Sequence, residues 1–314
     1  MTGKRLPSRN ASIFLRYASS IGQTLSEPNA NNAMTHHRAD TGRKRTAAEQ
    51  PASATVFDRW STTYDKDFTD CPPGAWLRDS VRRKIEPLLV AGSSVLEFGC
   101  GTGEDAAWFA GRGHPVLATD VAPQMLNVAR RKASTRGLAI EFQEFDLNRH
   151  EAADLPAGRQ FDVIFANFGV FNCVADPARL FSLCGKLVPP GGLVCTVVMG
   201  RFCAWETLWF VLRRRWRDAV RRWRGTAVVQ DGDAEFNVYY YSPRDLRSAA
   251  AEAFVPAGLT PIGIALPPSY LFRYEGRWPK TFRVLSTLER MAQKIGLFAY
   301  AADHYLLVLR RRKP

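Results

Sequence analysis

A glycine-rich stretch constrains the fold of this chain more than any other part of its sequence. Residues 95–103 are VLEFGCGTG, which places three glycines within five residues directly after an apolar run. Glycines after a buried strand let the backbone approach a ligand and turn into a helix whose N-terminus faces that ligand. The spacing is G-x-G-x-G, and Glu104 stands where the dinucleotide fingerprint G-x-G-x-x-G has its third glycine. The stretch predicts a nucleotide-binding loop, and its spacing argues against NAD.

Strands and helices alternate along the central part of the chain. The predicted strands are 94–98, 115–119, 140–145, 161–166 and 192–199, and the helices between them are about 103–112, 123–136 and 176–187. Further on we expect helices at about 243–255, with Ser242 as N-cap, and 279–297, and strands at 259–266 and 304–310. The alternation predicts an α/β fold with βαβ units, right-handed crossovers and a parallel sheet.

Three successive predicted strands end in acidic residues. Glu97 precedes the glycines, Asp120 lies 21 residues after Gly99, and Asp146 follows the third strand. A carboxylate at the position of Asp120 can accept hydrogen bonds from both hydroxyls of a ribose. Because open α/β sheets bind ligands at the carboxyl edge of their strands, these acids predict the binding site there.

Composition bears on membrane spans and on metals. No apolar run approaches the roughly 18–20 residues that a membrane span needs. The six cysteines form no CxxC pair, and they stand at positions 71, 100, 173, 184, 195 and 203. They predict free thiols in a reducing compartment. The histidines do not cluster with them, so we expect no metal site.

The net charge of +13 is unevenly distributed. Residues 1–45 carry eight lysines and arginines against two acids, and residues 213–224 carry seven arginines against one acid. Because the charge is local, the central body need not bind a polyanion, and nucleic acid is not an expected partner.

Residues 1–52 lack apolar periodicity and are rich in small polar residues and arginine. They predict either a disordered N-terminal extension or a targeting-like one, since the first 26 residues contain four basic residues and no acid. We expect a cytoplasmic protein, with organelle targeting by this extension as the alternative.

Several motifs together resemble a known family. They are VLEFGCGTG, ATDVAPQML, EFDLN, FDVIFANFGVFNCV and LVPPGGLV, which span residues 95–194 in order. The chain resembles class I S-adenosylmethionine-dependent methyltransferases of the small-molecule type, related to the ubiquinone/menaquinone and type 11 groups. FDRWSTTYDKDF, from residue 57, resembles the helix that caps the cofactor there.

The resemblance implies a Rossmann-like, mostly parallel seven-stranded sheet with an antiparallel last strand. This methyltransferase domain would cover residues 53–314, with helical cap insertions at about 200–258 and 267–300. The implied cofactor is S-adenosyl-L-methionine.

The resemblance also assigns residues to the cofactor. Those around its methionine part would be Tyr64, Glu97, Gly99, Cys100, Gly101, Gly103, Asn167 and Phe168. Those around its adenosine part would be Asp120, Val121, Met125, Asp146 and Leu147. In this assignment Asp120 binds the ribose hydroxyls and Asp146 accepts from the adenine amino group. The other interpretations are structural: Met125 as core, Glu97 as a capping partner and Tyr64 as a helix-face aromatic.

No residue is an obvious catalytic base. His114 lies at the edge remote from the cofactor, His150 lies in a polar loop, and His304 resembles a family position that is usually structural. The default mechanism is therefore alignment of donor and acceptor without a dedicated base.

A basic, tryptophan-rich helix is predicted over about 204–224. Its apolar residues recur at helical spacing, and arginines fill its other faces. Three interpretations stay open: a lid with a solvated arginine face, a helix at a membrane surface through 205–224, and nucleic-acid binding. The last is the weakest, because base-amino methyltransferases usually carry Asn/Asp/Ser-Pro-Pro-aromatic where this chain has Asn167-Phe168-Gly169-Val170.

The predicted function is methyl transfer to an O, N or C atom of a small apolar or aromatic metabolite. The residues expected to line the substrate side are Phe168, Phe171, Asn172, Arg201 and Tyr240, and both cap insertions would wall that pocket. The alternatives are a methyltransferase acting on a lipid or polyprenyl substrate at a membrane, and a non-catalytic methyltransferase-like binding subunit.

Overall fold

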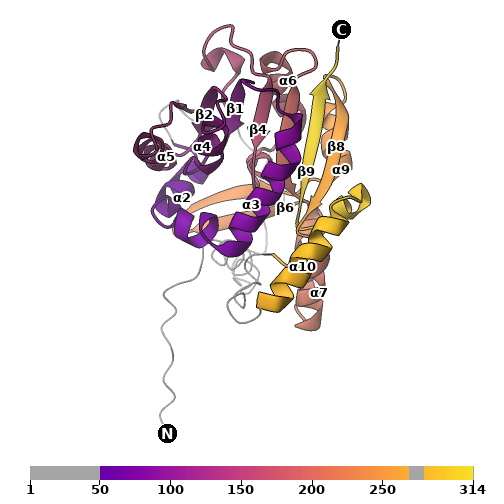
Figure 1. The fold of residues 1–314 in the computed structure, drawn as a ribbon. Coiled ribbons are helices and arrows are strands. Elements are labelled where there is room, and N and C mark those ends of the chain that lie inside the picture. Colours follow the sequence, from indigo (N-terminus) through magenta and orange to yellow (C-terminus); the bar gives the residue numbers. More distant parts are fainter. Residues whose placement is uncertain (1–49, 269–278, 314) are drawn as a thin grey trace, which may run out of the picture.

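A mixed seven-stranded sheet organises the protein (Figure 1). The computed structural model describes residues 50–268 and 279–313. The strands are β1 (Val95–Phe98), β2 (Val116–Asp120), β3 (Glu141–Glu144), β4 (Val163–Ala166), β5 (Leu193–Met199), β8 (Phe254–Ile262) and β9 (His304–Arg311). Their order is β3-β2-β1-β4-β5-β9-β8, with β1 to β5 parallel and β9 antiparallel to both β5 and β8. The predicted fold class is confirmed, and the antiparallel last strand lies between β5 and β8.

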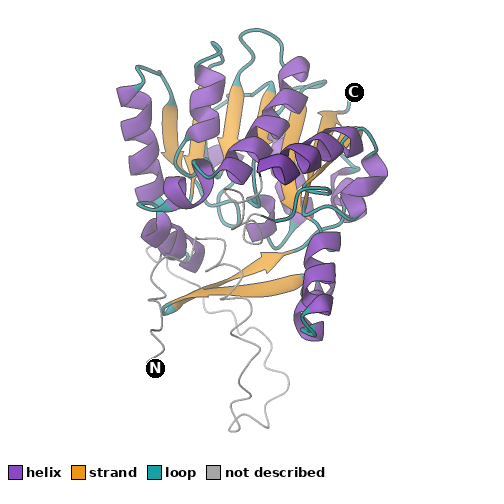
Figure 2. Ribbon diagram, turned by 60° about the horizontal axis from the view of Figure 1, so that its bottom comes forward, coloured by secondary structure: helices purple, strands orange, loops and turns teal. Residues whose placement is uncertain are grey.

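Helices pack on both faces of the sheet (Figure 2). The main helices of the body are α3 (Pro72–Ile85), α4 (Glu104–Ala110), α5 (Pro123–Thr135), α6 (Pro177–Leu187) and α9 (Pro243–Ala250). Alternate residues of β1 point to opposite faces, so Leu96 joins the core beneath α6 and α9, and Val95 joins the core beneath α3 and α4. The short, almost wholly apolar strands β1, β4 and β5 are buried on both faces, as expected for a parallel sheet.

The N-terminal part of the described chain lies over the carboxyl edge of the sheet. It consists of α2 (Ala52–Trp60) and the π-helical turn η1 (Asp65–Thr69), after which α3 runs along one face of the sheet. Asp65 joins η1 to the glycine-rich loop, because its Oδ1 accepts from Thr102 Oγ1 at 2.6 Å. Its Oδ2 pairs with Lys132 Nζ of α5 at 2.7 Å. Single π-helical turns recur at functional sites.

The prediction of one continuous helix over 204–224 is wrong. It is divided into α7 (Ala204–Leu212), α8 (Trp216–Ala219) and the 3₁₀ turn η5 (Arg221–Arg224). The chain breaks between α7 and α8 at Arg214, which has φ +58°. Such a backbone cannot continue a right-handed helix.

A two-stranded hairpin that was not predicted follows these turns. Its strands are β6 (Thr226–Asp231) and β7 (Ala234–Tyr239), and Figure 2 shows them apart from the main sheet. Val229 and Val238 of the hairpin pack with Trp60 of α2 and Met199 at the end of β5. The hairpin therefore covers the carboxyl edge beside α2.

The last third of the chain returns to the body. Ser242 caps α9 as predicted, in a capping box with Asp245, but the helix ends at Ala250. β8 begins at Phe254, earlier than predicted, and then come α10 (Pro279–Ala292), the 3₁₀ turn η8 (Gly296–Tyr300) and β9. Residues 254–258 of the predicted first insertion thus belong to the sheet. No helix among the described residues is long and apolar enough to cross a membrane. Residues 1–49 of the predicted extension, and 269–278 of the predicted second insertion, lie outside the described residues.

Candidate functional site

The carboxyl ends of β1, β2, β3 and β4 border a cavity that opens to solvent and has a volume of about 740 Å³ with its mouth included. A smaller cavity, of about 310 Å³ measured in the same way, shares part of its wall and reaches the glycine-rich loop. Predicted cofactor residues that line the larger cavity are Tyr64, Gly99, Gly101, Asp120, Val121, Met125, Asp146, Leu147, Asn167 and Phe168. Glu97 and Cys100 line the smaller one. The sequence thus predicted most of this wall, and only Gly103 among those residues lines neither cavity.

The glycines are required by backbone geometry. Gly99 has φ +61°, and a Cβ there would lie 2.4 Å from Val170 Cγ2. Gly103 has φ +79°, and a Cβ there would lie 2.8 Å from the Cβ of Ala129 in α5. Gly99 therefore keeps the cavity wall close to β4, and Gly103 lets α4 begin against α5.

Asp120 holds the glycine-rich loop at the end of β2. Its Oδ2 accepts from the Gly101 N–H at 2.8 Å, and its Oδ1 accepts from the Ala122 N–H at 2.9 Å. Burial raises its pKa to about 6, although these backbone donors oppose the rise. A carboxylate at the cavity wall can accept further hydrogen bonds from a ligand's hydroxyl groups.

Asp146 occupies the corresponding place after β3. Its Oδ1 accepts from the Asn148 N–H at 2.9 Å, and its own N–H donates to His150 Nδ1 at 2.9 Å. His150 therefore orders this loop. His114 is buried with its Nδ1 3.0 Å from the Ser93 carbonyl oxygen, away from the cavity. Neither histidine is placed as a base.

A buried polar cluster that sequence reasoning missed lies behind the smaller cavity. Asp105, in the first turn of α4, accepts from Arg78 Nη1, from Arg82 Nε at 2.8 Å and from Asn167 Nδ2 at 2.8 Å. Burial alone would raise the pKa of Asp105, but the charges of Arg78 and Arg82 outweigh it and hold that pKa below its ordinary value. The cluster joins α3 and α4 to the end of β4.

Three buried atoms around the smaller cavity have no hydrogen-bond partner among the described residues. They are Arg78 Nε, Glu97 Oε2 and Asn167 Oδ1. Burial, together with the negative charge of Asp105, holds the pKa of Glu97 well above its ordinary value. Unsatisfied buried polar groups cost free energy, so a native protein retains them where a ligand supplies the partners. One cationic donor and two acceptors match the carboxylate and the ammonium of an amino acid.

Phe168 lines both cavities in a strained conformation. Its φ of +49° is uncommon for a non-glycine residue. The ring packs edge-on against Phe68 at 5.1 Å and lies 5.4 Å from the Arg78 guanidinium. Such strain recurs at ligand-binding positions that the surrounding packing fixes.

A comparison with known protein families matches the part of the chain that contains this site. Residues 95–192 match the family described as "Methyltransferase domain". This stretch is a methyltransferase domain. It runs from the glycine-rich loop to the start of β5 and so contains the residues of β1 to β4 that border the cavities.

Curated relatives of the methyltransferase domain match part of the chain. A ubiquinone biosynthesis O-methyltransferase from Cereibacter sphaeroides is 36% identical over 115 residues, which are 37% of this chain and 44% of that protein. A ubiquinone/menaquinone biosynthesis C-methyltransferase from Bdellovibrio bacteriovorus is 36% identical over 151 residues, which are 46% of this chain and 61% of that protein. The chain thus spans about half the length of these relatives.

Solved structures share the fold beyond the domain's sequence match. A SAM-dependent methyltransferase from Methanosarcina mazei has a TM-score of 0.51 at 15% identity and covers 74% of this chain and 98% of its own. An S-adenosylmethionine-dependent methyltransferase from Clostridium acetobutylicum has a TM-score of 0.50 at 14% identity and covers 82% and 100%. The fold is therefore that of a class I methyltransferase.

Four of the predicted substrate residues lie outside the cavities of the methyltransferase domain. Phe171 is buried in the main core against Phe181. Asn172 has its amide on backbone groups of Met199 and Tyr239, so it joins β5 to the hairpin. These two residues shape the loop after β4, and neither lines the two cavities, so their role as substrate contacts stays a prediction.

Arg201 and Tyr240 likewise connect the hairpin to the body. Tyr240 is buried in the core beneath the hairpin, with its ring 5.4 Å from the Arg222 guanidinium. Arg201 Nε donates to the Tyr240 carbonyl at 3.2 Å and lies 3.6 Å from Asp245 Oδ2. Among the five predicted substrate residues, Phe168 is the one that lines the two cavities described above.

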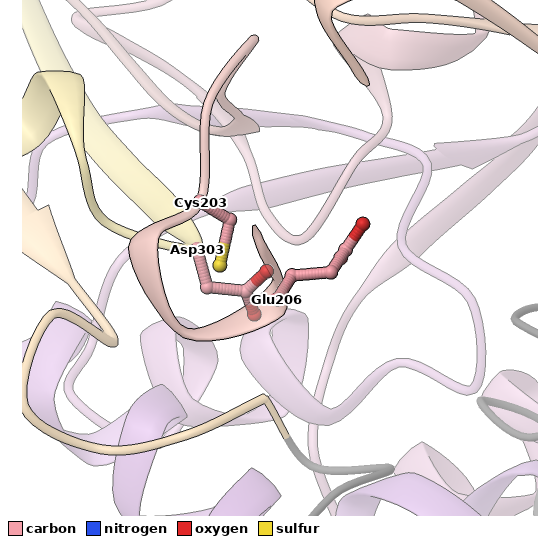
Figure 3. Close-up of side chains that lie close together, drawn as sticks. All are labelled: Cys203, Glu206 and Asp303. Carbon is pink, nitrogen blue, oxygen red and sulfur yellow. The ribbon is translucent and has the colours of Figure 1, made fainter. Parts of the chain in front are cut away.

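A second cluster of titratable groups lies between α7 and β9. Cys203, Glu206 and Asp303 come together there (Figure 3). Glu206 accepts from Arg221 Nε at 2.6 Å and from Arg222 Nη2 at 2.7 Å, and Arg222 Nη2 also donates to Asp303 Oδ1 at 2.6 Å. Guanidinium groups thus take the place that a metal ion would need. The cluster joins α7 and η5 to the start of β9.

Proposed function

We propose that this protein transfers a methyl group from S-adenosylmethionine to a small apolar or aromatic molecule. The observation that carries the proposal is the smaller cavity, where Arg78, Glu97 and Asn167 each present an unpartnered buried polar atom. These atoms match the amino-acid end of S-adenosylmethionine. The family match supports methyl transfer, and the solved methyltransferases that share the fold are named for their dependence on S-adenosylmethionine.

The rest of the cofactor fits the larger cavity. Asp120 would accept from the ribose hydroxyls, and Asp146 from the adenine amino group. The apolar side chains that would pack on the adenine belong to Val121, Met125 and Leu147, all in the wall. The polar groups of the two cavities would thus meet the amino-acid end, the ribose and the adenine of the cofactor in that order.

S-adenosylmethionine supplies a methyl group that is already activated on a positively charged sulfur. The protein's part is therefore to align the acceptor and exclude water. Tyr64 and Phe168 line both cavities and are placed to do this. Burial raises the pKa of Tyr64 to about 12, so its hydroxyl stays protonated near neutral pH and can donate a hydrogen bond but not act as a base.

The acceptor is proposed as a small aromatic or apolar metabolite. Phe57, Tyr64 and Phe168 give the larger cavity an aromatic wall. The relatives named for ubiquinone biosynthesis support an aromatic acceptor. All six cysteines are free, which supports a reducing, cytoplasmic setting for the reaction.

A panel of phenols, quinols, aromatic amines and non-aromatic acids tests this proposal. We expect mass spectrometry to detect S-adenosylhomocysteine and a methylated aromatic product. The rate of product formation should be greatly reduced in Asp120→Ala. It should be unchanged in Glu144→Ala, since Glu144 is exposed at the end of β3. Cofactor binding without turnover on any class would instead indicate a non-catalytic methyltransferase-like subunit.

Cofactor binding should depend on pH through Asp120. Its pKa is raised from 3.8 to about 6, and ribose hydroxyls donate to the ionised form, so binding requires loss of the proton. Affinity for S-adenosylhomocysteine should therefore be lost as the pH falls, by about tenfold for each unit below about pH 6. Calorimetry across this range checks the slope. Asp120→Asn should show a shallower slope, and an unchanged slope would contradict the assignment.

A further inference from the structure

Helix α10 exposes apolar side chains to solvent and buries polar ones, which is the reverse of the usual arrangement in a surface helix. Ser286, Glu289 and Gln293 face inward, whereas Val284, Leu288 and Met291 are 59%, 48% and 61% exposed. The inward polar groups are satisfied: Glu289 accepts from the N–H groups of the loop after β8, and Gln293 Nε2 donates to Ser80 Oγ of α3 at 2.7 Å. The orientation of α10 is thus fixed by polar contacts, and its apolar face points away from the body.

The same kind of surface continues beyond α10 and onto α7. Ile295 and Leu297, which follow α10, have exposed side chains. In the segment from α7 to η5, the exposed apolar side chains are Leu208, Leu212, Trp216 and Trp223. The Ala204 N–H, at the start of α7, donates to the Ala301 carbonyl just after η8 at 2.9 Å. Figure 1 shows α7 and α10 at the same end of the molecule. We call these exposed residues of 208–223 and 284–297 the apolar–basic surface.

The charges on this surface have one sign. In the ranges 204–224 and 280–300, both fully described, the exposed charged residues are Arg213, Arg214, Arg215, Arg217, Arg224, Lys280, Arg283, Arg290 and Lys294. The acids of these ranges, Glu206, Asp218 and Glu289, are all buried. An apolar stripe with tryptophan whose own two segments expose cations and no acid is complementary to an anionic lipid surface.

We infer that the apolar–basic surface docks on an anionic membrane, with α10 and the α7–η5 segment lying in the interface plane. Nucleic acid would pair with the arginines but would leave the stripe of Val284, Leu288, Met291 and Ile295 without a partner. The attachment is peripheral and independent of methyl transfer. It adds the exposed apolar face of α10 to the segment 205–224, which the sequence alone suggested as a membrane contact.

Vesicle flotation of the full chain tests this inference without any cofactor. The protein should float with phosphatidylcholine vesicles that contain phosphatidylglycerol, and far less with phosphatidylcholine alone or at raised ionic strength. Leu288→Glu combined with Met291→Glu should weaken binding by at least about tenfold, and so should Arg283→Gln combined with Arg290→Gln and Lys294→Gln. Both variants change exposed residues, so thermal unfolding should stay as in the wild type.

Val90→Glu is the matched control, because Val90 is 74% exposed but lies before β1 and outside the apolar–basic surface. It should float like the wild type. The inference is overturned if the wild type stays unbound on anionic vesicles, or if the α10 variants bind as the wild type does. It is also overturned if ultracentrifugation shows a dimer that Leu288→Glu with Met291→Glu dissociates, because the surface would then be an interface between two copies.

Discussion

Arg222→Met is expected to lower the free energy of unfolding by about 3–5 kcal/mol. Arg222 donates to both Glu206 and Asp303, and all three side chains are at most 8% exposed. Removing the guanidinium takes a shared cation away from two buried carboxylates, which costs far more than the net contribution of the intact pair. Chemical denaturation followed by circular dichroism measures the loss.

The controls for Arg222 separate burial from charge. Arg215→Met removes an arginine whose pair with Asp218 leaves it 51% exposed, so the expected loss is less than about 1 kcal/mol. Equal losses for Arg215→Met and Arg222→Met would contradict the account of the cluster as a buried tie between α7, η5 and β9.

Asp120→Ala is expected to weaken S-adenosylhomocysteine binding by about 5–150-fold, or about 1–3 kcal/mol. The substitution removes the acceptor for the ribose hydroxyls and also the acceptor that holds the Gly101 N–H. Calorimetric titration gives the ratio, and Glu144→Ala, one strand away and exposed, should bind as the wild type does. Wild-type affinity in Asp120→Ala would remove the ribose assignment.

Local patterns predicted the binding half of the fold well. The strands β1 to β5 lie within about two residues of their predicted positions, because buried parallel strands and glycine-rich turns leave strong signals in short windows. Asp120 and Asp146 reach the cavity because carboxyl ends of adjacent parallel strands share one edge. Topology alone thus brings residues distant in sequence together.

Contacts between distant segments were not predictable in the same way. Arg78 looks like an exposed helix residue in the sequence, yet its partner Asp105 lies 27 residues further along and buries it. Arg222 is buried by Asp303, 81 residues away. From sequence alone, arginines on a helix are therefore predicted to be exposed. Their burial becomes apparent only when the acidic residues that pair with them are known.

The substrate side was the least predictable part. Phe171 and Tyr240 are predicted to line the substrate side, but both lie in hydrophobic clusters, because aromatic side chains fill cores as readily as pockets. The hairpin that buries Tyr240 was missed, although Asp231-Gly232 between two alternating runs is a recognised hairpin signal.

The central claim is that Arg78, Glu97 and Asn167 hold the amino-acid end of S-adenosylmethionine. Calorimetry with two ligands tests it most directly: S-adenosylhomocysteine, and 5′-methylthioadenosine, which lacks that end. Because each of these buried polar groups would gain a hydrogen-bond partner, S-adenosylhomocysteine should bind at least about a hundredfold more tightly. Equal affinity for the two ligands, or no heat with S-adenosylhomocysteine from folded protein, would contradict the account.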